Sequence, residues 1–224
     1  MNKLAHIAFI MDGNGRWGLK NKRSRNQGHL EGVKTVQKIV EASIFFNVPI
    51  VTFYVFSSEN WSRPKTEINY LFNLIKIYFK NEINNIIKNK IKINILGRQN
   101  NLPNEIKKTL ISSVKKTKKN KKLIVNLAIN YGSKNEISDS VKKINLKSKK
   151  IDEENISRNL YLNLPFPDIL IRTGGQKRLS NFMLWQLAYT EIFFLDKLWP
   201  DFTKNDLKQV IKKFHKIKRN FGSI

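Results

Sequence analysis

The segment from residue 12 to residue 16, Asp-Gly-Asn-Gly-Arg, combines residue types that could hold a phosphate group. Two glycines let the backbone approach a ligand closely, and a helix beginning here would present free N–H groups. Arg16 adds a planar fork of donors that matches phosphate oxygens. Asp12 would repel a phosphate unless a hard cation such as Mg²⁺ lay between them. Taken alone, the segment is better explained as a tight turn with a capping aspartate.

A second set of candidate anion-binding residues, Arg172, Arg178 and Ser180, surrounds a Gly-Gly pair. Arg25 and His29 lie four residues apart, so on a helix they share a face, although a solvated basic helix end explains that pair equally well. Five of the nine arginines fall in these polar segments, namely Arg16, Arg25, Arg63, Arg172 and Arg178. Two separate groups of arginine indicate two phosphate groups or two diphosphates. Glu191 is a second candidate acid for a metal, or a surface or capping carboxylate.

The elements that must position these residues alternate between short apolar runs and longer helical patterns. The strand-like runs cover residues 6–11, 50–56, 91–96, 123–129, 168–172 and, less clearly, 191–195. Helix-period patterns cover residues 33–44, 66–88, 103–119, 134–147 and 203–217. Continuous apolar strands separated by helices predict an α/β fold with a central, mostly parallel six-stranded sheet covered by helices. We expect a single domain spanning residues 1–224.

The polar clusters follow the strand-like runs at residues 12–16, 57–63, 130–132 and 172–175. In an open parallel sheet, ligands bind outside the carboxyl ends of the strands. These clusters are therefore predicted to form one composite site, although the order of the strands cannot be read from the sequence. The helix at 66–88 carries a wide apolar face; core packing is the default explanation, and a lipid-binding tunnel would look the same in sequence.

The formal charge of +25 suggests a nucleic-acid partner, but the composition offers another explanation. Lysine, asparagine and isoleucine, which share A/T-rich codons, make up 88 of the 224 residues. A bias in base composition explains this excess at least as well as a selected surface. The sequence shows no zinc-finger spacing and no interleaved aromatics in its lysine-rich stretches. Nucleic-acid binding is therefore kept only as the non-enzyme alternative.

The sequence contains no cysteine, which excludes disulfides and thiolate chemistry, and its three histidines show no zinc-site spacing. We recognise no N-terminal signal segment, and no apolar run approaches the ~20 residues that span a bilayer. We expect a soluble, cytoplasmic protein whose cations could bring it to the inner face of an anionic membrane.

Several segments together resemble the cis-prenyltransferase family. They are HIAFIMDGNGRW from residue 6, FYVFSSENWSRP from residue 53, INYG from residue 129, DILIRTGG from residue 168, SNFMLWQLAYTEIFF from residue 180 and LWPDF from residue 198. The resemblance runs in order from His6 to Gly222, nearly without gaps. It implies a homodimer that depends on Mg²⁺. The implied reaction joins isopentenyl diphosphate to an allylic diphosphate, typically farnesyl diphosphate, and yields a long-chain cis-polyprenyl diphosphate that carries cell-wall precursors.

The resemblance also implies roles for individual residues. Asp12 would be the essential acid and a Mg²⁺ contact, and Glu191 a second Mg²⁺ contact that could act through the partner subunit. Asn60 would be linked to proton removal. Because an amide is a weak base, we expect Asn60 to orient a group or a water instead. The released diphosphate is a further candidate for the group that accepts the proton. The other implied residues bind substrate: Gly13, Asn14, Gly15, Arg16, Trp17, Arg25 and His29 at the allylic diphosphate, Ser57, Ser58, Glu59, Trp61 and Arg63 at the reacting centre, and Arg172, Arg178, Leu179 and Ser180 at the isopentenyl diphosphate.

Three positions depart from the family pattern. Gln176 stands where an acidic residue is common, Lys134 where the family has arginine, and Asn220 where arginine usually precedes Phe-Gly. The last departure puts a C-terminal contact across the dimer in question. A phosphatase that uses Asp12 as nucleophile is the alternative enzyme, but it needs a second aspartate where Asn14 stands. A non-catalytic partner subunit is a third alternative, against which Asp12 and the arginines argue.

Overall fold

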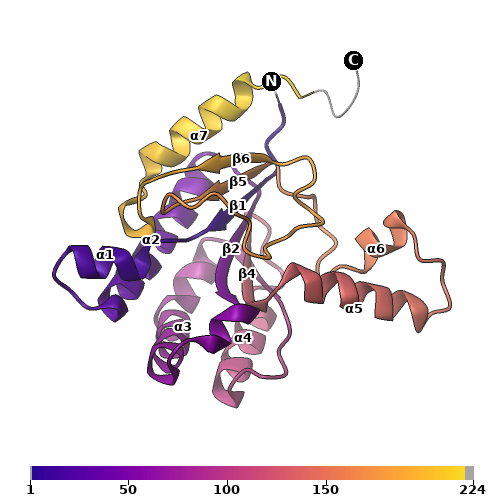
Figure 1. Cartoon of the computed structure of the whole chain (residues 1–224), viewed down its shortest axis with the longest axis horizontal. Helices are drawn as coiled ribbons and strands as arrows, with labels where there is room; N and C mark the ends of the chain where they lie inside the picture. Colours follow the sequence, from indigo (N-terminus) through magenta and orange to yellow (C-terminus); the bar gives the residue numbers. More distant parts are fainter. Residues whose placement is uncertain (1, 220–224) are drawn as a thin grey trace.

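The computed structural model describes residues 2–219, so Asn220 lies outside the described residues. Its centre is a six-stranded sheet with the order β3-β4-β2-β1-β5-β6, in which every pairing between neighbours is parallel (Figure 1). The strands are β1 (His6–Ile10), β2 (Ile50–Ser57), β3 (Ile91–Leu96), β4 (Leu123–Tyr131), β5 (Ile169–Arg172) and β6 (Glu191–Phe194). The helices are α1 (Asn14–Lys20), α2 (Arg25–Phe45), α3 (Lys65–Lys88), α4 (Asn104–Thr117), α5 (Ser133–Asn145), α6 (Glu153–Asn159) and α7 (Lys204–Lys216), with short 3₁₀ turns η1 (Ser58–Ser62) and η2 (Trp199–Asp201).

The predicted fold class is confirmed: a parallel six-stranded sheet flanked by helices in a single domain. All six strand-like runs form strands, and each predicted helical pattern falls within a helix or close to its bounds. The sequence did not predict α6, whose seven residues bury no side chain and so carry no apolar periodicity.

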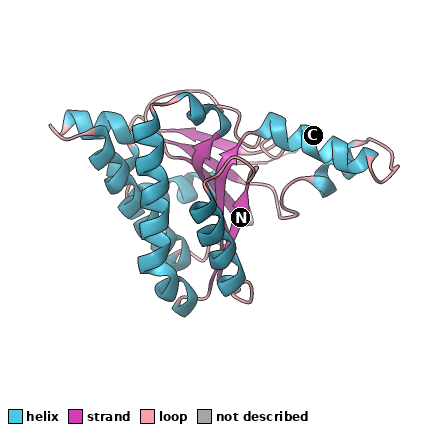
Figure 2. Ribbon diagram, turned by 90° about the horizontal axis from the view of Figure 1, so that it is seen from below, coloured by secondary structure: helices cyan, strands magenta, loops and turns pink. Residues whose placement is uncertain are grey.

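The two faces of the sheet are covered differently. One face packs against α2, α3, α4 and α7 in a large apolar cluster that includes Phe9, Phe53 and Trp199. Figure 2 shows these long helices gathered on one side of the sheet, while α5 extends away on the other. The second face meets a smaller cluster in which Phe182, Met183 and Leu187 come from an irregular segment instead of a helix. None of the helices within residues 2–219 is long and apolar enough to cross a bilayer.

Local capping signals fix where α2 begins. Ser24 accepts a hydrogen bond from the backbone N–H of Gln27, whose side chain accepts one from the backbone of Ser24 in return. This capping box makes Arg25 the first residue of α2 and places His29 one turn later on the same side. The predicted shared helix face of Arg25 and His29 is therefore present.

A row of polar side chains crosses the smaller-cluster face of the sheet. His6 Nε2 lies 2.7 Å from Thr52 Oγ1, which also accepts a hydrogen bond of 2.9 Å from Asn126 Nδ2. Asn94 Nδ2 donates in turn to Asn126 Oδ1 at 2.9 Å. This polar row of His6, Thr52, Asn126 and Asn94 thus joins four neighbouring strands. Burial lowers the pKa of His6 to about 4, even though a hydrogen bond to the Pro165 carbonyl and the charge of Asp168 oppose the shift.

We expect the pH dependence of stability to report on His6. Its folded-state pKa lies below the usual 6.5, so between about pH 6.5 and 4 the unfolded chain binds a proton that the folded chain does not. The free energy of unfolding should therefore fall by up to about 3 kcal/mol as the pH drops through that window. Urea titrations of wild type and His6→Gln at several pH values test this, and an equally steep fall in His6→Gln would contradict it.

Candidate active site

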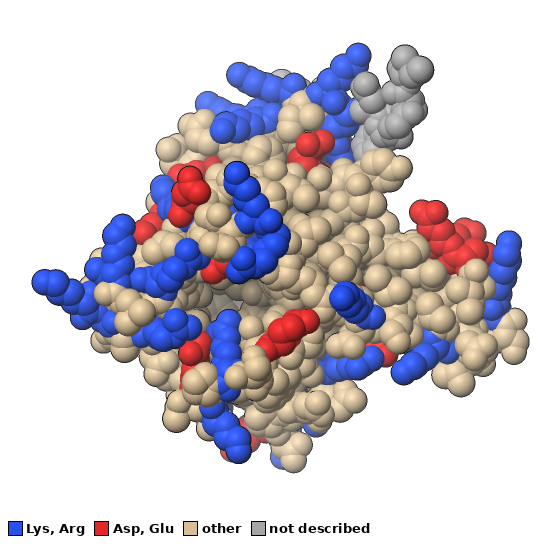
Figure 3. All heavy atoms as spheres, viewed as in Figure 1, with Lys and Arg blue, Asp and Glu red and all other residues tan. Residues whose placement is uncertain are grey.

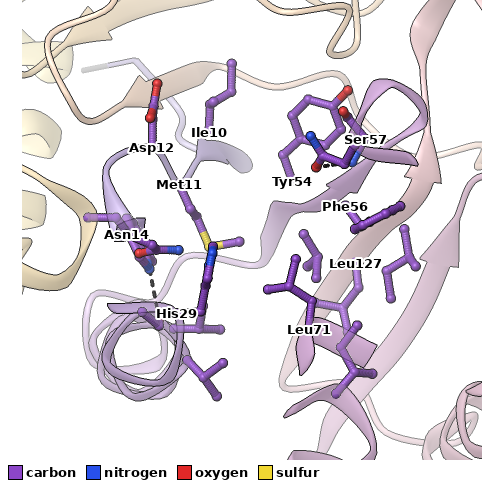
Figure 4. A pocket seen from close by; sticks show the side chains of 18 of the residues that line it. Ile10, Met11, Asp12, Asn14, His29, Tyr54, Phe56, Ser57, Leu71 and Leu127 are labelled. Atoms are coloured by element: carbon purple, nitrogen blue, oxygen red, sulfur yellow. Dashed lines mark hydrogen bonds between the residues drawn. The ribbon is translucent and has the colours of Figure 1, made fainter. Parts of the chain in front are cut away.

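A cavity of about 670 Å³ opens at the carboxyl ends of β1, β2 and β5 and runs between α2, α3 and the sheet. Its mouth is polar and its depth is apolar (Figure 4). Asp12 and Ser57 lie at one end, whereas Leu71 and Leu127 line the other. Figure 3 shows lysine and arginine side chains around a hollow in this face of the molecule. Three of the four predicted strand-end clusters, at residues 12–16, 57–63 and 172–175, contribute side chains to this cavity, whereas the cluster at 130–132 does not.

Asp12 follows β1 and is held by two arginines from different segments. Arg16 Nη2 donates to Asp12 Oδ1 at 3.1 Å, and Arg172 Nη2 donates to Oδ2 at 2.8 Å. The Thr173 hydroxyl donates to the Asp12 carbonyl at 2.8 Å, which fixes the backbone. Gly174 has φ +87°, and a Cβ there would lie 2.5 Å from Arg16 Nη2. A glycine at this turn is therefore needed for Arg16 to reach the end of β5.

Arg172 is almost fully buried, with 3% of its side chain exposed. Besides Asp12, it donates to Ser180 Oγ at 2.8 Å and to the carbonyl of Arg178. Its Nε is a buried donor without a hydrogen-bond partner in the structure. Ser180 adopts φ +50°, which a non-glycine residue rarely takes. Arg172 thus joins the carboxylate that follows β1 to the strained segment that carries Ser180.

The Gln176 departure bears directly on Arg178. Gln176 Oε1 accepts a hydrogen bond of 2.6 Å from Arg178 Nη1. A carboxylate at this position would cancel a cationic charge, whereas the amide holds Arg178 without cancelling it. At Lys134, the side chain is exposed, and it is the backbone N–H that donates, at 2.9 Å, to Asn181 Oδ1.

Three cationic or ionisable side chains meet at Glu67, which the sequence did not single out. Arg63 Nη1 lies 3.0 Å from Glu67 Oε1, His29 Nε2 lies 3.3 Å from the same oxygen, and Arg25 Nε lies 3.3 Å from Oε2. Burial raises the pKa of Glu67, but its interactions with Arg25, Arg63 and His29 outweigh burial and lower it. Burial also lowers the pKa of His29, against the opposing effect of Glu67. The four-residue spacing of Arg63 and Glu67 was the sequence signal from which this ion pair, and so the role of Glu67, could have been predicted.

The segment after β2, residues 57–62, is held in place by hydrogen bonds of its own side chains. Asn60 Oδ1 accepts a hydrogen bond of 3.0 Å from the Ser57 backbone N–H, which closes η1 as a capping box. Glu59 accepts one of 2.7 Å from Asn181 Nδ2. Burial alone would raise the pKa of Glu59, but hydrogen bonds from Asn181 and the neighbouring serines lower it. Asn181, also missed from the sequence, therefore ties the 57–62 segment to the one that carries Ser180.

The predicted site residues divide by position. Ten line the cavity: Asp12, Asn14, His29, Ser57, Glu59, Asn60, Arg63, Arg172, Arg178 and Ser180. Gly13, Gly15, Arg16, Trp17, Arg25, Ser58, Trp61 and Leu179 lie behind or beside this lining. Trp61 donates to Asn130 Oδ1 at 2.8 Å and packs against Phe56 and Phe72, so in this structure it supports the wall.

Glu191 does not lie with Asp12 in this chain. It begins β6, opposite Ile169, whereas Phe194 at the other end of β6 pairs with Arg172. Three residues along a strand correspond to about 10 Å. The Glu191 carboxylate instead lies 3.7 Å from Arg219 Nε. A route for Glu191 to the site through a partner subunit stays a prediction.

The donor set around Asp12 suits Mg²⁺ only together with substrate oxygens. Within residues 2–219, no three histidine, aspartate or glutamate side chains are close enough to cage a metal ion. Mg²⁺ is commonly held by one or two carboxylates together with phosphate oxygens and waters. The Asp12 side chain is 27% exposed at the cavity mouth, so its carboxylate is accessible for such shared coordination.

Sequence comparison finds relatives over nearly the whole chain. A family model described as "Putative undecaprenyl diphosphate synthase" matches residues 10–222. A curated isoprenyl transferase from Fusobacterium nucleatum is 44% identical over 220 residues, which cover 98% of this chain and 96% of the relative. One from Rickettsia felis is 42% identical over 224 residues, which cover 99% and 95%.

Two solved structures have the same fold. A probable undecaprenyl diphosphate synthase from Campylobacter jejuni superposes with a TM-score of 0.87 at 37% identity over the full length of both chains. Lavandulyl diphosphate synthase from Lavandula x intermedia, solved with dimethylallyl diphosphate, superposes with a TM-score of 0.93 at 28% identity over 97% of this chain and 98% of that one.

Proposed function

Because this chain belongs to the isoprenyl transferase family, a family of cis-prenyltransferases, we propose that it joins isopentenyl diphosphate to farnesyl diphosphate. Repeated cycles would yield a long cis-polyprenyl diphosphate, undecaprenyl diphosphate, with one diphosphate released in each. We further propose that this lipid serves as a carrier for cell-wall synthesis. The observation that carries the proposal is one cavity with an Arg- and Asp-bearing mouth and an apolar depth. That shape suits a molecule with a charged head and a hydrocarbon tail.

The reaction needs positive charge where the leaving group departs. The allylic C–O bond would break with its electron pair moving to the diphosphate. The alkene of isopentenyl diphosphate would then form the new C–C bond, and the resulting cation would lose a proton to the released diphosphate or to a water oriented by Asn60. Arg16, Arg25 and the N–H groups at the start of α1 would hold the departing diphosphate. Asp12 would hold Mg²⁺ together with phosphate oxygens, and the ion would neutralise charge that develops on them.

The second diphosphate is proposed to bind at Arg172, Arg178 and Ser180, next to the start of α1, since Arg16 and Arg172 share Asp12. Arg178 is exposed and is held by the Gln176 amide through one of its N–H groups, while Arg172 is fixed by Asp12 and Ser180. Asn60 lines the cavity, and its oxygen is already engaged by the Ser57 N–H. Its amide N–H₂ group can therefore orient substrate or water, in agreement with an orienting role instead of a basic one.

The direct test is product formation by the purified protein. With Mg²⁺, farnesyl diphosphate and labelled isopentenyl diphosphate, we expect label in a butanol-extractable lipid and an equivalent release of diphosphate. Chain length is read after dephosphorylation by mass spectrometry. Absence of product would overturn the proposed activity, and DNA binding that persists at high salt would favour the nucleic-acid alternative.

Product length should depend on the wall between two cavities. A second cavity of about 290 Å³ shares Val36, Tyr78, Phe79 and Leu127 with the first and extends toward the start of β3. In Val36→Phe the larger ring would narrow the shared wall, so we expect shorter products with the first condensation slowed less than about tenfold. Val40→Phe, which lines only the second cavity, should shorten products less. Unchanged product length in Val36→Phe would show that the tail does not pass this wall.

We propose that two copies of the chain form the active protein. The edge strand β6 carries apolar side chains that a partner would cover, with Ile192 at 38% and Phe194 at 36% exposure. Light scattering measures the mass in solution, and a monomer at assay concentrations would contradict the proposal.

We also propose that the excess of lysine assists contact with anionic membrane, where the product would be used. Vesicles containing phosphatidylglycerol should sediment the protein at low salt and release it as ionic strength rises. A lack of sedimentation at low salt would exclude this role.

A further inference from the structure

Glu67 is a carboxylate at the wall of a site built for anions. It lies in the first turn of α3, after Pro64, with 11% of its side chain exposed. Four contacts converge on its two oxygens: Arg63 Nη1 at 3.0 Å, His29 Nε2 at 3.3 Å, and Arg25 through Nε at 3.3 Å and Nη2 at 3.5 Å. Two of the partners, Arg25 and His29, come from α2, and Arg63 comes from the loop that precedes α3.

The partners of Glu67 face the places where phosphate would lie. His29 and Arg63 line the cavity, and the Arg25 guanidinium lies so close to the backbone of α1 that a Cβ on Gly15 would be 2.8 Å from it. Arg25 is about half exposed and Arg63 about one-third exposed, whereas Glu67 is not. A ligand entering the mouth would therefore meet the two guanidinium groups, with the carboxylate behind them.

We propose that Glu67 is a positioning residue that holds Arg25, His29 and Arg63 as one aligned group for the diphosphate of the allylic substrate. This inference rests on the proposed function, because the ligand it names is the substrate of that reaction. Two long arginine side chains are costly to immobilise at the moment of binding. If the two arginine side chains are already held by a buried carboxylate, much of this entropic cost is met before the ligand binds. The negative charge of Glu67 also offsets the repulsion between the two guanidinium groups.

The charge of the group supports this role. Burial lowers the pKa of His29, which favours its neutral form, while Arg25 and Arg63 bring two guanidinium charges to the one carboxylate of Glu67. The carboxylate does not fully neutralise the arginines, which leaves a net attraction for a diphosphate. Arg25 and Arg63 each retain N–H groups that Glu67 does not engage, and these can donate to phosphate oxygens.

Glu67→Gln and Glu67→Asp test the proposal in the full-length protein. In Glu67→Gln the amide presents N–H groups to the arginines, so we expect kcat/KM for farnesyl diphosphate to fall about 10- to 100-fold, mostly through KM. Glu67→Asp keeps the charge and should recover part of the loss. Glu31→Gln is the matched control, since Glu31 pairs with Lys34 at 2.8 Å and Arg23 at 3.9 Å but does not line the cavity. It should stay within twofold of wild type.

A double-mutant comparison separates positioning from general stability. If Glu67 acts through the arginines, Glu67→Gln should cost much less in an Arg25→Gln/Arg63→Gln background than in wild type. Equal losses in both backgrounds, or a wild-type KM in Glu67→Gln, would overturn the positioning role and leave the proposed function intact. Calorimetry with inorganic diphosphate gives a readout that does not need turnover. Weaker binding by Glu67→Gln than by Glu31→Gln supports the proposal even if farnesyl diphosphate is not the substrate, and equal binding overturns it.

Discussion

Replacing Asp12 with asparagine or alanine is expected to lower product formation about 1,000-fold. The carboxylate binds Arg172 at 2.8 Å and Arg16 at 3.1 Å, and within residues 2–219 it is the only acidic side chain that pairs with both arginines. Its removal takes away the proposed Mg²⁺ contact and leaves the buried guanidinium of Arg172 without a counter-charge. The second effect should cost about 1–3 kcal/mol of unfolding free energy.

The Asp12 variants are measured by labelled product and by urea titration. Asp139→Asn is a suitable control, because Asp139 forms an ion pair of 2.7 Å with Arg98 away from the cavity. Its loss should affect stability without a comparable loss of activity. Product formation near the wild-type rate in Asp12→Ala would exclude the assigned role, and recovery of activity in Asp12→Asn by raised Mg²⁺ would show that metal affinity is the main defect.

Replacing Arg172 with lysine is expected to lower kcat/KM for isopentenyl diphosphate about 100-fold or more. The guanidinium reaches Asp12, Ser180 and the carbonyl of Arg178 at once, and a single ammonium cannot span all three. The segment around Ser180 would lose the contact that holds its left-handed backbone in place. We therefore expect KM for isopentenyl diphosphate to rise more than KM for farnesyl diphosphate.

Arg98→Lys provides the matched comparison for Arg172→Lys. Arg98 also makes paired contacts with a carboxylate, through Nε at 2.9 Å and Nη2 at 2.7 Å to Asp139, but it lies outside the cavity lining. Initial rates at varied concentrations of each substrate give the two KM values. Equal increases in both would indicate that Arg172 does not belong to one diphosphate site.

The elements of this fold could be predicted because the signals for them are local. The six apolar runs that became strands are bounded by polar or glycine-bearing segments, and helix periodicity marked the apolar face of α3. The order of the strands could not be read, because β1 lies between β2 and β5 through contacts that no local pattern encodes. α6 was missed since none of its residues is buried.

Several residues of the candidate site could be picked out from the sequence, but two residues that hold them in place were missed. Arg172 and Ser180 stood out as anion-binding residue types, and Asp12 as an acid that could share a metal ion with phosphate; the structure brings both Asp12 and Ser180 within hydrogen-bonding distance of Arg172. Glu67 was not found although Arg63 lies only four residues away, because its other partners, Arg25 and His29, are 42 and 38 residues distant; Asn181 meets Glu59 across 122 residues of sequence. Trp61 was assigned to the reacting centre, but its ring packs in the wall, a distinction that residue type cannot make.

The polar row of His6, Thr52, Asn126 and Asn94 selects one alignment of strands that would otherwise be nearly interchangeable. β1, β2 and β4 are almost wholly apolar and both of their faces are buried, so a slip by one residue would still bury hydrophobic side chains. Such a slip in β2 would carry the Thr52 hydroxyl to the face packed by α2 and α3, away from the ring of His6. Each polar group buried there without a hydrogen-bond partner would destabilise the misaligned sheet by about 1–3 kcal/mol. A misaligned nascent sheet is thus penalised as soon as it forms, which shortens the time its open edges are available for aggregation.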